Sequence, residues 1–260
     1  MRNLTVKKMN KPSIKKFSRY ELKYIIPTSL GNTIARDLLD YLDFDSYGDK
    51  QGTYPITSLY YDSPDYSAYW DKIEGERFRR KVRVRIYGGQ SVGADDKCAV
   101  EIKQRINKSV QKKRVFIPCT SAISLCEHGV PATVETDADR MVVQEVQYLS
   151  RTLRLQPTCI VAYNRQAFNG GLYDSGLRVT FDTALKGRLH SLSLLDKHLA
   201  ENHFFLSPEW CIMEVKVNQR VPYWLVELLN RYQCTLRRIS KYCTALETFK
   251  TSLLAQQIEH

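Results

Sequence analysis

The fold is decided by residues 77–87, which read RFRRKVRVRIY and end at the Gly88-Gly89 pair. Successive side chains of a β-strand point to opposite faces, so this stretch predicts a strand with one face that is basic from Arg77 to Arg85. That face carries Arg77, Arg79, Lys81, Arg83 and Arg85, and the other face carries Phe78, Val82, Val84 and Ile86. Like charges about 7 Å apart repel by roughly 0.6 kcal/mol in water, and by several-fold more where the effective dielectric constant falls to about 20 near a protein surface. Either water or an anion must therefore face these cations.

Charged side chains also share one face in most of the other predicted strands. The sets are Glu21 with Lys23, Glu101 with Lys103 and Arg105, Lys112 with Arg114, Arg178 with Asp182, and Glu214 with Lys216, while Arg165 follows Tyr163. A sheet that is basic on one side in strand after strand is either solvated there or encloses an anionic ligand. Phosphate chains fit best, because Arg and Lys both bind phosphate oxygens. The few carboxylates could then hold a divalent cation between phosphates.

The arrangement of elements predicts an α+β fold. Strands are expected over 17–27, 54–62, 77–87, 98–106, 109–118, 158–168, 172–182 and 210–218, with Gly170-Gly171 as a tight turn. Helices are expected over 66–73, 137–153, 222–232 and 240–254, and 191–207 is either irregular or a helix. A further helix would be capped by Thr28 or Ser29 and would carry Leu30, Ile34, Leu38 and Leu42 on one face.

No βαβ unit repeats, so the strands are expected to be antiparallel. Closure into a barrel with covering helices would remove the edge strands. One domain over 17–256 would follow a basic, flexible arm over 1–16.

Composition excludes several classes of protein. The chain has 260 residues, a net charge of +11, 43% hydrophobic and 11% aromatic residues, which excludes wholesale disorder. No stretch reaches the roughly 18–20 apolar residues of a membrane span, and the N-terminus lacks the apolar region of a secretory signal. The 7 cysteines are scattered without CxxC spacing, so we expect reduced thiols in a cytoplasmic protein. Neither GxxxxGK[ST] nor GxGxxG nor GxSxG occurs, and the histidines form no metal-binding set.

Eight short motifs, in order, resemble those of the VTC domain, the polyphosphate polymerase module of the triphosphate tunnel (CYTH-like) metalloenzymes. They are RYELK (19–23), SLYYDS (58–63), KVRVRIY (81–87), EIK (101–103), YNR (163–165), LRVTFD (177–182), MEVK (213–216) and SKY (240–242). The resemblance spans residues 17 to 250. It implies an antiparallel barrel of about eight strands around a basic tunnel, and transfer of the terminal phosphoryl group of ATP to a growing polyphosphate chain. A stand-alone domain of bacterial type is expected.

The resemblance also implies roles for individual residues. The phosphate-binding catalytic residues would be Lys23, Arg83, Arg85, Lys103, Arg165, Arg178 and Lys241. Further substrate contacts are expected from Arg79, Lys81, Lys112, Arg114, Lys216 and Ser240. Glu214 would ligate catalytic Mn²⁺ or Mg²⁺, and Glu21, Glu101 and Asp182 would either add metal ligands or form ion pairs. Tyr163 and Tyr242 could stack a base or lie in the core.

The sequence leaves alternatives open. Arg19 stands where related triphosphatases carry an additional glutamate, which favours the polymerase. A tunnel triphosphatase would nevertheless use the same interior, and a non-catalytic polyphosphate-binding module would need no metal ligand. Specific nucleic-acid binding is not expected, because the residues that share one strand face from Arg77 to Arg85 are all cationic, without interleaved aromatic residues. A membrane-protein partner at the cytoplasmic face of a membrane is compatible with the resemblance.

Overall fold

A single antiparallel sheet organises the computed structural model, which describes residues 19–88, 92–107, 109–172, 174–195, 202–218 and 220–258. Eight strands follow one another across the sheet: β1 (Arg19–Pro27), β10 (Trp210–Asn218), β8 (Arg178–Arg188), β7 (Gln156–Gly170), β3 (Thr53–Asp62), β4 (Phe78–Tyr87), β5 (Lys97–Ile106) and β6 (Ser109–Pro118). Two short strands lie off this path, β2 (Leu42–Phe44) against β7 and β9 (His203–Phe204) against β8. The expected arm over 1–16 lies outside the described residues.

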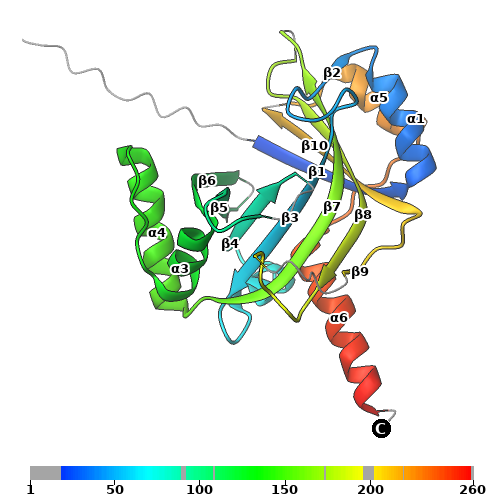
Figure 1. Cartoon of the computed structure of the whole chain (residues 1–260). Coiled ribbons are helices and arrows are strands. Elements are labelled where there is room, and N and C mark those ends of the chain that lie inside the picture. Colours follow the sequence, from blue (N-terminus) through cyan, green and yellow to red (C-terminus); the bar gives the residue numbers. More distant parts are fainter. Residues whose placement is uncertain are drawn as a thin grey trace, which may run out of the picture.

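The sheet curls until its two edge strands approach each other. Cα atoms of β1 and β6 come within 8 Å, and the Nζ of Lys103 on β5 lies 2.7 Å from a carboxylate oxygen of Glu21 on β1. Among the described residues, however, no hydrogen-bonded ladder joins β1 to β6. The antiparallel α+β fold is therefore confirmed, whereas closure into a complete barrel is not. The concave face lies between β1 and β6 in Figure 1.

Apolar residues on the convex face hold four helices against the sheet. Val84 and Ile102 pack with α3 (Cys119–His128) and α4 (Asp137–Leu153), and Val179 and Met213 pack with α1 (Thr28–Leu38) and α5 (Tyr223–Arg231). Figure 1 shows these two helical pairs at opposite sides of the sheet. Alternation within each strand thus turns the apolar side chains outward under helices and the charged ones inward.

The lower end of the concave face is covered by α6 (Lys241–Ile258), beside α2 (Ser67–Ile73) (Figure 1). Ile56, Val161 and Leu185 of the sheet form one buried cluster with Tyr242 and Leu246 of α6. The interior is therefore apolar where α6 enters and charged above it. None of the helices described is both long and apolar enough to cross a membrane.

Helix and strand boundaries differ from the predictions in several places. Helix α4 and strand β10 span the predicted residues, but α3 was not predicted. Pro27, rather than the predicted Thr28 or Ser29, occupies the N-cap position of α1, and it makes no side-chain cap bond because proline has no polar side-chain atom. The Thr28 hydroxyl donates to the Pro208 carbonyl. Leu42 lies in β2 rather than on the helix.

The β7–β8 connection and the segment after it also differ from the predictions. Strand β7 continues through Gly170, so the expected tight turn is a longer connection that reaches Arg178. Strand β8 runs on to Arg188, past a bulge at Ala184, whose φ is +50°. Within 191–207, residues 191–195 are irregular and β9 is a strand, while 196–201 lie outside the described residues.

Helix α4 ends on a strained residue, which provides a test of the fold. Arg154 has φ 49° and ψ 51°, the left-handed region, and is exposed. The left-handed region costs a non-glycine residue about 1–2 kcal/mol, and glycine avoids this strain. Part of the benefit is offset because glycine has more conformational entropy to lose on folding, so Arg154→Gly should raise the free energy of unfolding by about 1 kcal/mol. Urea denaturation measures the change.

Met141, which is 69% exposed in the same helix, supplies the control. Glycine there should lower the free energy of unfolding by about 1 kcal/mol, because Met141 has ordinary helical geometry. A loss of stability in both variants would contradict the assigned end of α4.

Candidate functional site

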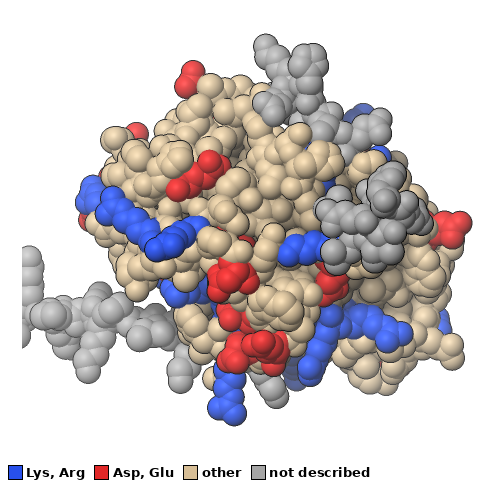
Figure 2. Space-filling model, turned by 90° about the horizontal axis from the view of Figure 1, so that it is seen from below, with Lys and Arg blue, Asp and Glu red and all other residues tan. Residues whose placement is uncertain are grey.

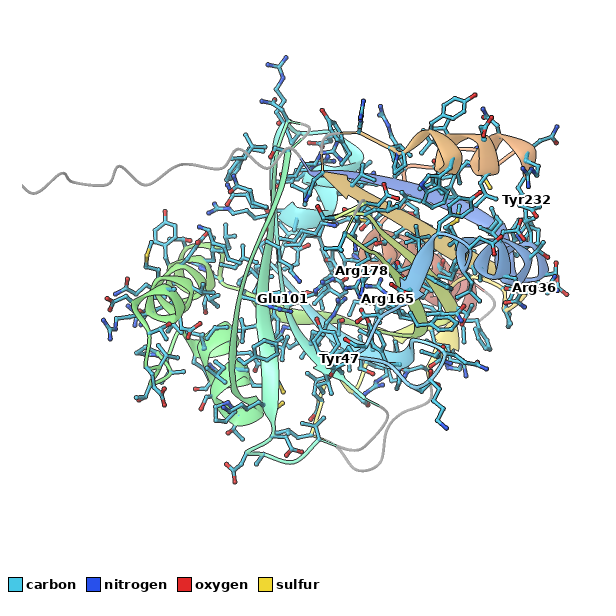
Figure 3. All side chains as sticks on the ribbon, turned by 90° about the horizontal axis from the view of Figure 1, so that it is seen from above. Arg36, Tyr47, Glu101, Arg165, Arg178 and Tyr232 are labelled. Carbon is cyan, nitrogen blue, oxygen red and sulfur yellow. The ribbon has the colours of Figure 1, made fainter. Side chains whose placement is uncertain are left out.

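Strand pairing brings the predicted charged residues together on the concave face. Lys23 lies opposite Glu214, and Lys216 lies opposite both Glu21 and Arg178. Across the other half of the sheet, Arg83 lies opposite Glu101 and Lys103 opposite Lys112. Residues from strands far apart in the sequence thus share one interior. Figure 3, seen from above, shows Glu101, Arg165 and Arg178 around it.

The centre of the site is an ion-pair cluster around Glu214 and Asp182. Lys241 Nζ lies 2.6 Å from Asp182 Oδ2 and 2.9 Å from Glu214 Oε1, and Lys216 Nζ lies 3.1 Å from Glu214 Oε2. Arg165 donates two hydrogen bonds of 2.7 Å to Asp182. Both carboxylates are buried, so charge pairing rather than solvent stabilises them.

The pKa values of the central carboxylates reflect these cations. Burial acts to raise the pKa of Glu214, but Lys241, Lys23 and Lys216 outweigh it and hold the pKa well below its usual range. Burial likewise acts to raise the pKa of Asp182, but Arg165 and Lys241 outweigh it, so this pKa is also lowered. Both groups are therefore anionic at neutral pH.

Two further carboxylates organise the cations of β1, β4, β5 and β6. Glu21 lies 2.7 Å from Lys103 and 3.5 Å from Lys23. Glu101, fully buried, accepts hydrogen bonds of 2.9 and 2.6 Å from Arg83 and lies 3.2 Å from Lys112. The pKa of each carboxylate is lowered despite burial, by Lys23 and Lys103 at Glu21 and by Arg83 and Arg85 at Glu101. Glu101 thus fixes the Arg83 guanidinium in place.

Three lysines of the concave face have lowered pKa values, although their side chains differ in exposure from 23% at Lys216 to 44% at Lys112. Burial lowers the pKa of Lys216 to about 8 even though Glu214 acts against it. Burial also lowers the pKa of Lys103 and of Lys112, against the opposing effects of Glu21 and Glu101 respectively. Burial is the largest cause of these depressed pKa values, whereas at Lys23 and Lys241 the carboxylate partners outweigh burial and raise the pKa. A bound polyanion would raise the pKa values of the three depressed lysines.

Two interior cations of β4 bind only neutral groups among the described residues. Arg85, which is 5% exposed, donates to the Ser58 and Tyr163 hydroxyls at 3.0 and 3.1 Å. Lys81 lies 3.1 Å from the Ser240 hydroxyl and 3.0 Å from the Cys243 sulfur, both near the start of α6. Within the described part of the chain, no carboxylate within ion-pair distance neutralises their positive charges.

The remaining predicted residues lie nearer the edges of the site. Arg178 pairs with Asp45 and donates to the Tyr54 hydroxyl at 2.9 Å. Arg79 is half-buried, and its pKa is lowered by burial and by Arg105. Arg114 is exposed and lies over the Phe116 ring, so it lies at the edge strand rather than deep in the interior.

The contacts of Lys112 and Lys113 show to which face of the sheet each side chain in this stretch of β6 points. Lys113 points to the convex face and lies 2.6 Å from Glu145 of α4, whereas Lys112 contacts Glu101 on the concave face. The outer surface seen from below carries basic and acidic side chains next to one another (Figure 2). The cations of the site, by contrast, are gathered on the concave face of the sheet.

Sequence reasoning missed several polar partners of the cations. Asp45, in the loop after β2, anchors Arg178, and Ser58, Tyr60 and Tyr163 bind guanidinium groups. Ser58, Tyr60 and Tyr163 have inward parity on their strands, which is a usable signal, but no periodicity points to Asp45. Tyr163 and Tyr242 were expected either to stack a base or to lie in the core, and the structure supports the core. Tyr163 is 5% exposed and accepts a hydrogen bond from Arg85, and Tyr242 is 1% exposed and donates one to Asp62.

The residues present fit a hard divalent cation only in part. No cluster of three His, Cys, Asp or Glu side chains in the described ranges could hold a metal alone. Thr180, directly opposite Glu214, carries the one buried side-chain oxygen that lacks a partner in the described part of the chain. Carboxylate and hydroxyl oxygens suit Mg²⁺ or Mn²⁺ when substrate phosphates complete the shell, so a shared site fits and a protein-only site does not.

A family profile and a relative of known name match most of this chain. The VTC domain profile matches residues 18–250. Vacuolar transporter chaperone complex subunit 4 of Trypanosoma brucei brucei is 25% identical over 228 residues, which are 75% of this chain but 28% of the relative.

Two solved structures give weaker likenesses. One is a Bacillus halodurans protein provisionally named adenylate cyclase, with 10% identity and a TM-score of 0.49 over 86% of this chain and 95% of that one. The Schizosaccharomyces pombe Mediator head module gives 8% identity and a TM-score of 0.44 over 84% and 96%. Because the family profile extends from before β1 into α6, the chain belongs to the VTC domain family.

Proposed function

We propose that this chain is a metal-dependent phosphotransferase that moves the terminal phosphoryl group of ATP onto a growing polyphosphate chain. The observation that carries the proposal is the surplus of buried positive charge on the concave face. Arg85 and Lys81 contact only neutral groups among the described residues, and the pKa of Lys216 is depressed to about 8. A linear polyanion would satisfy both features along a path that crosses several strands.

The reaction requires little covalent chemistry from the protein. A terminal oxygen of the acceptor chain attacks the γ-phosphorus, the bond from the γ-phosphorus to its bridging oxygen breaks, and ADP leaves. We propose that Arg85, Arg165 and Lys241, which are all buried, neutralise charge on the phosphoryl oxygens. No Ser or Cys nucleophile is required.

Glu214, with Thr180 facing it, is the residue that we propose to hold the divalent cation together with substrate phosphates. The cation would supply Lewis-acid neutralisation of phosphoryl charge. Glu101 is instead proposed as a positioning residue, because it accepts two hydrogen bonds from the Arg83 guanidinium and, unlike Glu214, has no unpartnered buried oxygen opposite it among the described residues.

A tunnel triphosphatase is the second candidate, and one observation favours it. Helix α6 covers the lower end of the interior through Lys241 and Tyr242, and hydrolysis needs only one opening whereas polymer extension needs an exit. Incubation with ATP and Mn²⁺, followed by gel electrophoresis, separates the two activities. The proposal predicts a ladder of polyphosphate, and phosphate release without a ladder would establish the triphosphatase.

We further propose that the domain works beside a membrane-protein partner at the cytoplasmic face. The relative in Trypanosoma is a subunit of a vacuolar transporter chaperone complex, and this chain spans 28% of its length. A partner would carry polymer away from the site.

Glu214→Gln tests the role of the central carboxylate. We expect polyphosphate synthesis to fall by about 100-fold or more while tripolyphosphate binding is retained, because the variant loses a metal ligand but keeps the cations. Radiolabelled ATP measures turnover, and calorimetry measures binding. Glu145→Gln is the control, since Glu145 pairs with Lys113 on the convex face. Unchanged synthesis in Glu214→Gln would contradict the assignment.

Arg85→Gln tests which cations bind phosphate. Because Arg85 has no ion-pair partner among the described residues, its removal should weaken tripolyphosphate binding by about 10-fold or more. Arg80→Gln, on the convex side of the same strand over Phe78, should bind as the wild type does. If the affinity for tripolyphosphate fell equally in both variants, binding would depend on the overall positive charge of the protein, and the specific role of Arg85 would be contradicted.

A further inference from the structure

The upper rim of the concave face carries an exposed aromatic residue that the phosphate chemistry does not use. We infer that Tyr47 is the platform on which the base of a nucleoside triphosphate stacks while its phosphates lie on the interior cations. The inference rests on the proposed function for the phosphate site, and it adds a residue that distinguishes a nucleotide from inorganic polyphosphate.

Tyr47 is exposed but held rigidly. Its side chain is 60% exposed, and its ring packs edge-on against Tyr54 at 5.0 Å and 79°, and against Tyr87 at 5.5 Å and 72°. Two neighbouring rings thus fix the orientation of the third without covering it. A planar base could stack on the uncovered ring, as aromatic side chains do in nucleic-acid sites.

The loop that carries Tyr47 is braced by its own hydrogen bonds. The buried Asp45 carboxylate accepts from the Tyr47 backbone N–H at 3.1 Å, and Asp49 accepts from the backbone N–H groups of Gln51 and Thr53 at 2.8 and 2.9 Å. Gly52, with φ 67°, closes the turn. The ring therefore needs little ordering when a base binds, which favours affinity.

The same contacts connect Tyr47 to the cations that we propose bind phosphate. Asp45 also pairs with Arg178, and Arg178 donates to the hydroxyl of Tyr54 at 2.9 Å. The Tyr87 hydroxyl donates to Glu101 at 3.4 Å. Figure 3 shows Tyr47 by the interior that also holds Glu101, Arg165 and Arg178. A base on Tyr47 would thus lie at the entrance and its phosphates would point inward.

Other aromatic residues fit this role less well. Tyr163 and Tyr242 are buried, and Tyr41, although 51% exposed, stacks at 4.2 Å on Trp224 over α5, away from the interior. Stacking does not depend on hydrogen-bond readout of the base, so ATP and GTP should bind with similar affinity.

The test compares two ligands in four proteins: the wild type, Tyr47→Leu, Tyr47→Phe and Tyr41→Ala. Calorimetry measures binding of a non-hydrolysable β,γ-imido analogue of ATP and of inorganic tripolyphosphate. Leucine keeps apolar packing against Tyr54 and Tyr87 but removes the ring face, so Tyr47→Leu should bind the ATP analogue about 5- to 100-fold more weakly. Its affinity for tripolyphosphate should stay within about twofold of the wild type, as expected where only the base stacks.

The remaining variants complete the test. Tyr47→Phe retains a ring and Tyr41→Ala lies outside the site, so both should bind the two ligands as the wild type does. If Tyr47→Leu lost affinity for both ligands equally, or for neither, the inference about Tyr47 would be overturned. The proposed phosphate site would still stand, because the wild type would still bind tripolyphosphate. A wild type that binds neither ligand would overturn the proposed function, and the inference with it.

Discussion

Buried positive charge in excess of its carboxylate partners is the constraint on which this structure depends. Glu21, Glu101, Asp182 and Glu214 each contact more than one cation. These pairs neutralise part of the positive charge but leave Lys81 and Arg85 with only neutral partners among the described residues. An interior of this kind is stable without ligand, yet it is completed by a polyanion.

The arrangement of helices follows from the same strand alternation. Each strand presents apolar residues to the convex face, where α1, α3, α4 and α5 cover them, and charged residues to the concave face. Helix α6 instead enters the concave side, and it brings Lys241 to the central carboxylates while Tyr242 packs below. The helix therefore both covers the apolar end of the interior and supplies a residue of the site.

Strand periodicity predicted most of the site, because parity is a local property. The basic face of residues 77–87 and the inward positions of Lys23, Lys103, Lys216 and Glu214 follow from it. Closure of the sheet could not be predicted, since it depends on curvature accumulated over eight strands. Asp45 and Tyr47 were missed because an irregular loop has no period, and α3 was missed because its cysteines and serines give a weak helical pattern.

The central claim is that the cations of separate strands bind one phosphate chain inside the curved sheet. A crystal structure of the protein with tripolyphosphate tests it most directly. The account predicts phosphate oxygens within hydrogen-bonding distance of Arg85 and Lys81, between β1 and β4. Density for the ligand on the convex surface, with the concave cations still paired only to protein groups, would contradict it.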